Sequence, residues 1–282
     1  MASFKPRRRA PRRRPARKTA RKPSAALKAA IVSVVKRQSE TKFASTYSGQ
    51  LFPNPCPIGA SGNNGHNGTI NGPQDIHALV PPIGYGPEYY QRVGTRISPL
   101  SLYLQLDVSI GGANTFPVNP ENLMVVMYIL SCKDERNYAD LNANNRLGTL
   151  IKDGQGGVQG FNATAINAKC SVNDDVFTLH KKLTFPLRCS GYSGALPPST
   201  IAVTQNMNSA PFARRFNMNL TKYLPKKLEY SNVLTGNAIV DDNPINSTLF
   251  MCFGFYDQTL GPTPSGTLIE VNYQTTIKYK DA

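Results

Sequence analysis

Apolar and polar residues alternate most clearly in the segment Ser98–Ile110. Leucines at every second position from Leu100 to Leu106, followed by Val108 and Ile110, share one side of an extended chain. The intervening residues are a serine, a tyrosine, a glutamine, an aspartate and a second serine. This period of two predicts a β-strand with one buried face and one solvated face.

Other segments carry different strand patterns. Asn122–Cys132 is apolar almost throughout, which predicts a strand that is buried on both faces. Further strands are expected at Lys42–Leu51, Val176–Phe185, Arg215–Leu224, Asn246–Tyr256 and Thr267–Tyr279. Glycine and proline, at 22 residues each, fall mostly between these runs. The pattern predicts an all-β fold, a single jelly-roll β-sandwich of about eight antiparallel strands with long loops.

Charge is concentrated at the N-terminus. Residues 1–42 hold 15 of the 32 Lys and Arg residues but only one of the 17 acids, Glu40, so this segment has a net charge of +14. The rest of the chain is left at +1. Because like charges repel and four prolines interrupt any helix, residues 1–23 are expected to form a disordered Arg/Lys-rich arm.

Residues 24–42 are expected to link this arm to the folded domain, residues 43–282. Ser24 can serve as the N-cap of a helix. Apolar residues then follow at helical spacing and predict a short amphipathic helix, namely Leu27, Ile31, Val34 and Val35. A marginal helix or an unstructured linker is the alternative, because isolated helices of this length rarely persist in water.

The arm carries the strongest chemical signal in the sequence. Guanidinium groups pair bidentately with phosphate and stay charged at any cellular pH. The arm is therefore predicted to bind nucleic acid with little sequence preference and with strong salt dependence. Such runs also serve as nuclear import signals, and the two roles are compatible. The predicted nucleic-acid-binding residues are Lys5, Arg7, Arg8, Arg9, Arg12, Arg13, Arg14, Arg17, Lys18, Arg21 and Lys22.

The folded domain offers little catalytic chemistry. Its histidines, His66, His77 and His180, lack neighbours at the spacing of metal ligands, so no metal and no cofactor are predicted. No nucleophile motif has the required spacing, and the chain is not expected to be an enzyme. Three acidic pairs leave calcium binding as a minor alternative to solvated loop charges, at positions 134–135, 174–175 and 241–242.

Cysteine usage and hydropathy point to a reduced, non-membrane protein. The five cysteines are widely and irregularly spaced, which predicts reduced and mostly buried thiols. No apolar run reaches the length of a membrane span, and no secretory apolar region follows the basic N-terminus. Membrane insertion is therefore not expected.

The run Tyr89–Leu102 (YYQRVGTRISPLSL) contains a Gly-x-x-Ile-x-x-x-x-Leu sequence at the entry to the clearest strand. Together with the Arg-rich arm, the short linker and the single neutral β-rich domain, it resembles the capsid proteins of circular, Rep-encoding single-stranded DNA viruses. The overall layout is also similar to that of capsid proteins of small positive-strand RNA viruses.

This resemblance implies a jelly roll that assembles with copies of itself into a closed icosahedral shell. The arm would then bind the viral genome, with single-stranded DNA favoured over RNA. The resemblance also implies a location in the virion and, for a DNA genome, in the host nucleus, with a nuclear import receptor as a further partner. Long loops would supply the contacts between copies, at Asn54–Pro87, Asn137–Lys169 and Gly191–Pro211.

Two other classes of function stay open. One is a cellular basic-tailed β-sandwich that binds nucleic acid, of ribosomal or chromatin type. The other is an enzyme on a jelly-roll scaffold, which would need a set of His and carboxylate metal ligands. The first class usually spreads basic residues over its folded face. In this chain the basic residues of the folded domain are offset by 16 acids. The basic residues singled out in the domain are Lys133, Arg136, Lys181, Lys182, Arg214, Arg215, Lys226 and Lys227.

Overall fold

The computed structural model divides into two compact units, Met1–Ser39 and Glu40–Ala282. None of the helices in the described part of the chain has the length and hydropathy needed to cross a membrane. The residues that the structure describes are 24–28, 30–31, 40–47, 56–58, 70, 75–110, 123–187, 213–231, 234–235, 238–239, 242–257 and 269–281.

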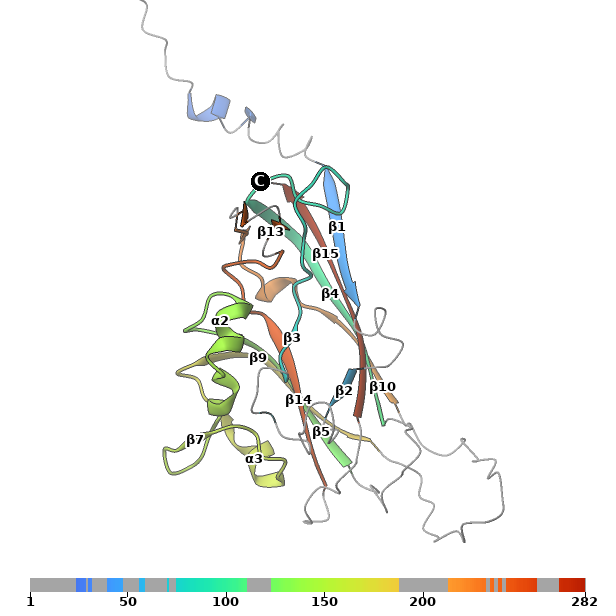
Figure 1. Ribbon diagram of the computed structural model, residues 1–282, viewed down its shortest axis with the longest axis vertical. Helices are drawn as coiled ribbons and strands as arrows, with labels where there is room; N and C mark the ends of the chain where they lie inside the picture. The colour runs from blue at the N-terminus through green and yellow to red at the C-terminus, as the bar shows by residue number, and fades with distance from the viewer. Residues whose placement is uncertain are drawn as a thin grey trace, which may run out of the picture. The chain divides into compact units, whose positions relative to one another are not determined.

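The second unit contains two four-stranded antiparallel sheets (Figure 1). Sheet I consists, in spatial order, of β1 (Thr41–Tyr47), β15 (Ile269–Asp281), β4 (Arg96–Ile110) and β10 (Ala213–Asn219). Two short strands extend it, β2 (Cys56–Ile58) on β15 and β11 (Leu228–Glu229) on β4. Sheet II consists of β3 (His77–Ala78), β14 (Phe250–Asp257), β5 (Leu123–Cys132) and β9 (Phe177–Leu187). A separate hairpin pairs β12 (Leu234–Thr235) with β13 (Ala238–Ile239).

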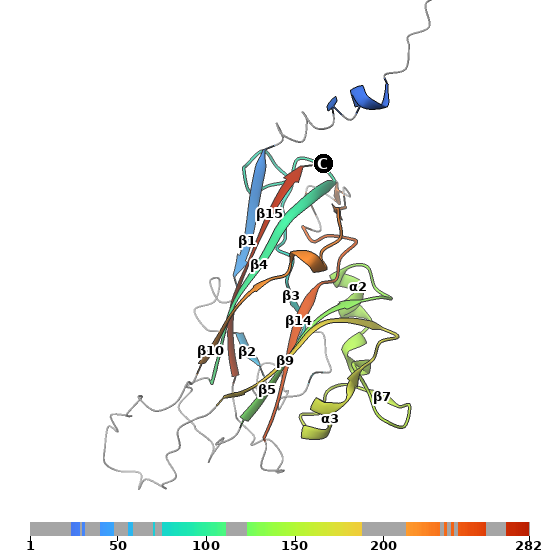
Figure 2. The ribbon, with the colours of Figure 1, turned by 180° about the vertical axis from the view of Figure 1, so that it is seen from behind.

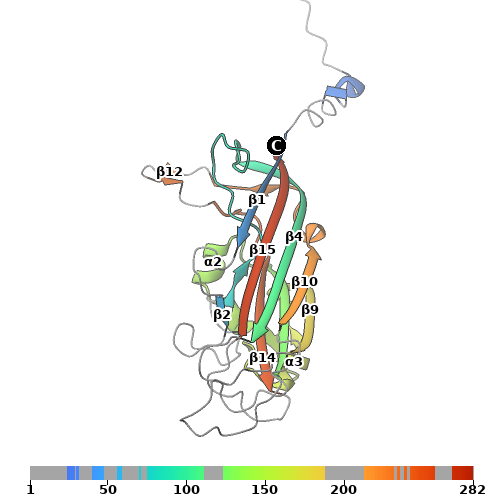
Figure 3. The ribbon, with the colours of Figure 1, turned by 90° about the vertical axis from the view of Figure 1, so that its right-hand side faces the viewer.

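The connectivity of these strands is that of a jelly roll. If the eight strands of the two sheets are numbered in chain order, sheet I reads 1-8-3-6 and sheet II reads 2-7-4-5. The chain changes sheet at every step except from β5 to β9, which are neighbours in sheet II. Figure 3 shows β1, β15, β4 and β10 side by side with β14 and β9 behind them. The predicted all-β jelly-roll sandwich is thus confirmed.

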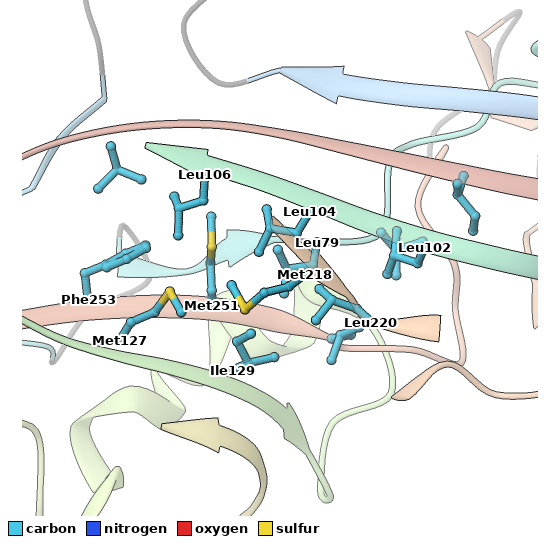
Figure 4. Close-up of a cluster of buried hydrophobic side chains, with 14 of the residues drawn as sticks. Leu79, Leu102, Leu104, Leu106, Met127, Ile129, Met218, Leu220, Met251 and Phe253 are labelled. Atoms are coloured by element: carbon cyan, nitrogen blue, oxygen red, sulfur yellow. The ribbon is translucent and has the colours of Figure 1, made fainter. Parts of the chain in front are cut away.

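The space between the sheets is filled by alternate side chains of the facing strands (Figure 4). The alternation predicted for β4 supplies apolar side chains to this space, because every second residue from Leu102 to Val108 is buried. Sheet II contributes residues from β5 and β14, and β10 and its following turn close one edge. The main contributors are Leu102, Leu104, Leu106, Val108, Val125, Met127, Ile129, Met218, Leu220, Met251, Phe253 and Phe255.

Sheet II is also covered on its other face, by the segment between β5 and β9. This insertion consists of α2 (Tyr138–Ala143), the 3₁₀-helix η2 (Arg146–Thr149), α3 (Ala165–Lys169) and a small sheet of β7 (Val158–Gln159), β6 (Ile151–Lys152) and β8 (Ser171–Val172). Figures 1 and 2 show α2, α3 and β7 beside sheet II, on the side away from sheet I. A second core lies beneath it, with Val126, Tyr128, Leu130, Leu141, Leu147, Leu150, Phe161, Phe177, Phe250 and Cys252.

The two cores confirm that β5 is buried on both faces, as its continuous apolar run predicts. They also correct the expectation that Asn137–Lys169 is a long loop, because Leu141, Leu147 and Phe161 are fully or almost fully buried. The apolar residues of this segment are irregularly spaced, so its fold is set by burial against sheet II rather than by periodicity.

Three further expectations, about a loop, the end of a strand and the burial of Leu100, were wrong. Asn54–Pro87 is not one surface loop, since it contains β2 and β3 and buries Leu79 and Ile83 completely. The strand expected to reach residue 224 ends with β10, and the 3₁₀-helix η3 (Thr221–Tyr223) follows it. Leu100 is 46% exposed rather than buried, because the β4–β15 pairing shifts register at this point and leaves Leu100 without a partner.

His77 is also not in a surface loop. It lies on β3 and is 7% exposed, with its ring 5.9 Å from the ring of Phe253 and 6.0 Å from that of Tyr273. Burial lowers the pKa of this imidazole from 6.5 to about 4. The histidine is therefore neutral in the folded core at neutral pH.

The two-faced character of β4 can be tested with neighbouring substitutions. Leu104→Ala removes a fully buried side chain from the core between the sheets and is expected to lower the free energy of unfolding by about 2–5 kcal/mol. Gln105→Ala, on the opposite side of the same strand, is expected to change it by no more than about 0.5 kcal/mol. Equilibrium urea unfolding measures both. Equal losses for the two variants would contradict the assignment.

The buried His77 predicts a pH dependence of stability. The unfolded chain takes up a proton near pH 6.5, whereas the folded protein takes it up only near pH 4. Stability is therefore complete above pH 6.5 and falls as the pH decreases toward 4, by up to about 3 kcal/mol. Urea unfolding of the wild type and of His77→Leu at several pH values isolates this contribution. The same pH slope in both proteins would contradict it.

Candidate nucleic-acid interface

The eleven basic residues predicted to bind nucleic acid, at positions 5–22, lie outside the described residues. The segment that follows them is described in part. Residues 25–28 and 30–31 are helical, and Ser24 caps this helix because its Oγ accepts a hydrogen bond of 3.2 Å from the backbone N–H of Leu27. Leu27 and Ile31 are 51% and 52% exposed. The helix therefore presents two apolar side chains, one turn apart, to solvent.

Several basic side chains of the folded domain are engaged within the domain itself. Arg215 of β10 contacts both carboxylate oxygens of Asp107 on β4, at 2.7 and 3.3 Å. Lys182 of β9 donates hydrogen bonds to the carbonyls of Ala168 and Cys170, at 2.6 and 3.4 Å, where α3 ends. Burial lowers the pKa of Lys182. These two residues fix strands and the insertion in place and contribute no free charge to a ligand surface.

The other singled-out basic residues differ in their surroundings. Lys181 is half-buried, and its ammonium group lies 3.5 Å from the sulfur of Met218. Lys133 donates a hydrogen bond to the backbone carbonyl of Asp174. The remaining four are exposed: Arg136, Arg214, Lys226 and Lys227.

A basic pocket of about 370 Å³ lies between the start of the insertion and the segment after η3. Lys133 and Arg136 line one side of it, and Tyr223, Leu224 and Pro225 line another. Glu135 also lines this pocket, but its carboxylate is 2.9 Å from the guanidinium of Arg146. The hydrogen bonds from Asn144 and Arg146 lower the pKa of Glu135. The pocket is thus bordered by two basic side chains and by an acid that is already paired.

No described segment of the chain covers the outward side of sheet I, which is called here the open face. It is formed by β1, β15, β4 and β10, which lie in front in Figure 3. The side chains on this side are exposed or half-buried. They are mainly amides and hydroxyls, arranged in rows by the strand register. The described members are Phe43, Ser45, Ser101, Tyr103, Gln105, Asp107, Ser109, Arg215, Asn217, Asn219, Asn272, Gln274, Thr276 and Lys278.

Three rows of the open face follow from the pairing. Phe43 lies opposite Lys278, which lies opposite Ser101. In the next row Ser45, Thr276, Tyr103 and Asn219 follow one another across all four strands. The hydroxyls of Ser45 and Thr276 are 3.0 Å apart. The third row places Gln274, Gln105 and Asn217 side by side on neighbouring strands. Alternation in the sequence places Tyr103 and Gln105 on one side of a strand, but the residues beside them depend on the sheet order.

Aromatic rings gather where β1 begins. Phe43 is 45% exposed and its ring lies 5.2 Å from that of Tyr89, which in turn lies 5.2 Å from the ring of Tyr90. Tyr89 and Tyr90 are 54% and 47% exposed. Exposed rings in contact with one another are a common feature of surfaces that bind a partner.

The start of β1 is held firmly to the rest of sheet I. Lys42 is buried, and its ammonium group lies 2.9 Å from the carboxylate of Asp281 and donates a 2.9 Å hydrogen bond to the carbonyl of Gln91. Glu40 begins the second unit, directly before the first residue of β1, Thr41. Because β1 is fixed by Lys42, the basic segment is attached to a rigid edge of sheet I.

The remaining candidates for chemistry have structural partners. Ser131 Oγ lies 2.7 Å from Nε2 of His180, and the His180 ring packs 4.5 Å from that of Tyr223. Burial and the charge of Lys222 lower the pKa of His180. Asp174 and Asp175 both contact Lys152.

The described residues also include candidates for metal binding and several thiols. No group of His, Cys, Asp and Glu among them could hold a metal ion. Cys132 and Cys252 are buried free thiols, and burial raises the pKa of both. His66, Cys189 and Asp241 lie outside the described residues.

Known proteins give no further guide to this surface. A scan against protein-family models and a search of curated proteins found no match to this chain. Function is therefore inferred from the fold, the charge distribution and the open face.

Proposed function

We propose that this chain is the coat protein of a small icosahedral virus. Its jelly-roll domain would assemble with copies of itself into a closed shell, and its basic N-terminal arm would bind the packaged single-stranded nucleic acid. The observation that carries the proposal is the division of charge, +14 in residues 1–42 and +1 in the rest of the chain. A polyanion is the natural partner of the first part, and a near-neutral surface suits close packing of many identical domains.

The fold supports the same proposal. A jelly roll is a compact β-sandwich that is used in viral shells. The exposed apolar side chains near β1 offer contact surface for another copy, among them Tyr90, Val93 and Leu100. A closed shell built from one chain needs several different contact patches of this kind.

The genome is proposed to be single-stranded DNA in preference to RNA, because the layout of the chain resembles coat proteins of circular single-stranded DNA viruses. The protein would then be found in the virion and, during assembly, in the host nucleus. The arginine runs at residues 7–9 and 12–14 would be read by an import receptor. The proposal requires no cofactor and no enzymatic reaction.

The first test is assembly of the full-length chain. Expressed protein is expected to form uniform spherical particles that contain nuclease-protected nucleic acid. Gel filtration, electron microscopy and nuclease digestion measure this. A monomer that persists at high protein concentration over a range of salt and pH would contradict the proposal.

The role of the arm is tested in the same particles. Deletion of residues 2–23 removes eleven basic side chains and is expected to abolish packaging while the jelly roll stays folded. If about seven phosphates are bound, the logarithm of the affinity of the full chain for single strands falls with the logarithm of salt concentration at a slope of about −5.

A charge-conserving variant provides the control for this deletion. Replacing the six arginines of the two triplets by lysine keeps the charge and is expected to retain most packaging. Unchanged nucleic-acid content after the deletion would show that the arm does not hold the polymer.

A further inference from the structure

The basic arm offers almost no aromatic ring on which a base could stack. Residues 1–42 contain a single aromatic residue, Phe4, and no tryptophan or tyrosine. Arginine and lysine bind phosphate, so the arm accounts for the backbone of a bound strand. Proteins that hold single strands also use aromatic rings, on which bases stack. Any such contact from this chain must come largely from the folded domain.

The open face provides rings of this kind. Tyr103 lies near the centre of sheet I and is 47% exposed, and Phe43 is 45% exposed. Phe43 on β1 is in the same row as Ser101 on β4, and Tyr103 is in the next row of β4. Tyr103 is therefore two strands and one row away from Phe43. Strand spacing and rise place the Cα atoms of Phe43 and Tyr103 about 12 Å apart. The ring of Tyr89 lies 5.2 Å from that of Phe43 and enlarges the aromatic surface there.

The groups around these rings can bond to base edges. The amide row of Gln274, Gln105 and Asn217 lies one row beyond Tyr103, and Asn219 is directly opposite Tyr103. Amides and hydroxyls donate and accept hydrogen bonds, as the Watson–Crick edges of unpaired bases require. Rings on a four-stranded sheet surrounded by such groups form a surface suited to splayed single-stranded bases.

Charge on the open face does not oppose a polyanion. Asp107 is the one acid among its described side chains, and Arg215 neutralises it at 2.7 Å. Lys278 is exposed and lies beside Phe43 in the ladder. Phe43 also lies within four residues of Ser39, where the basic unit ends, so phosphate-binding charge is covalently attached to the strand that carries this ring.

A second copy of the chain fits this face less well. The centre of a protein–protein interface is normally apolar and closely packed. Here Phe43 and Tyr103 lie in adjacent rows whose other members are polar or charged, and the row beyond Tyr103 is made of amides. Two rings set among polar side chains favour a flexible ligand that supplies its own flat, hydrogen-bonding groups.

We propose that the open face of sheet I binds bases of single-stranded nucleic acid, which stack on Phe43 and Tyr103 and are hydrogen-bonded by the neighbouring amides. The inference rests on the proposed function for the presence of a packaged strand, but it assigns a second binding surface to the folded domain. The arm would supply salt-dependent phosphate contacts, and the open face would supply a contribution that salt hardly changes.

Binding of the full-length chain to an iodouracil-containing single-stranded DNA tests this. Ultraviolet cross-linking followed by mass spectrometry is expected to map links to Tyr103 and to the Phe43–Tyr89 pair. Tyr103→Ala and Phe43→Ala are each expected to weaken binding by about fivefold or more without changing the slope of affinity against salt. Tyr103→Phe keeps the ring and is expected to bind like the wild type.

Tyr85→Ala is the matched control, because Tyr85 is an equally exposed tyrosine outside the open face, at 51%. Cross-links confined to the arm, with unchanged affinity in Tyr103→Ala, would overturn the inference even if filled particles form. Loss of particles in Tyr103→Ala with unchanged DNA binding would also overturn it and would make the open face a contact between copies. Cross-links to Tyr103 without any particle formation would uphold the inference and contradict the coat-protein proposal.

Discussion

The requirement that sheet II be covered on both faces determines much of this structure. Its central strands β5 and β14 carry large apolar side chains on each side, with Met127 and Phe253 toward sheet I and Tyr128 and Phe250 away from it. Leaving either side in water would forfeit on the order of 2 kcal/mol for each large side chain. Sheet I covers one face, and the insertion between β5 and β9 covers the other.

This arrangement makes the two sheets unequal. Sheet II is an internal layer, whereas sheet I has one apolar face and one face of amides, hydroxyls and a paired charge. The inequality has a functional consequence under the proposal made above. The strand that follows the basic segment, β1, belongs to sheet I, so the charged arm is covalently joined to the sheet that carries the open face. Lys42 holds this junction through Asp281.

Local patterns in the sequence predicted the parts of the fold that depend on local physics. Alternation located β4, the continuous apolar run located β5, and Ser24 was recognised as a helix cap. β3 was missed because it has only two residues and no period of its own. The insertion was taken for a loop because its apolar residues are spaced irregularly and meet only when sheet II gathers them.

The candidate surfaces also differ in whether local sequence alone predicts them. The arm is recognisable from composition alone, because its charge needs no fold to be counted. The open face is not, because its rows combine residues of β1, β15, β4 and β10 that are far apart in the sequence. Ser45 and Thr276, for example, are 231 positions apart and in contact. Likewise, sequence could not tell that Arg215 is paired with Asp107 or that Lys182 binds the end of α3.

The central claim is that the basic arm and the open face of sheet I act on the same packaged strand. Electron cryomicroscopy of nucleic-acid-filled particles tests it most directly, because it shows which side of each subunit meets the interior. Density for bases is expected against Tyr103 and Phe43, with the insertion of α2 and α3 on the opposite side of the sandwich. An open face buried between subunits or turned to the outside of the shell would contradict it.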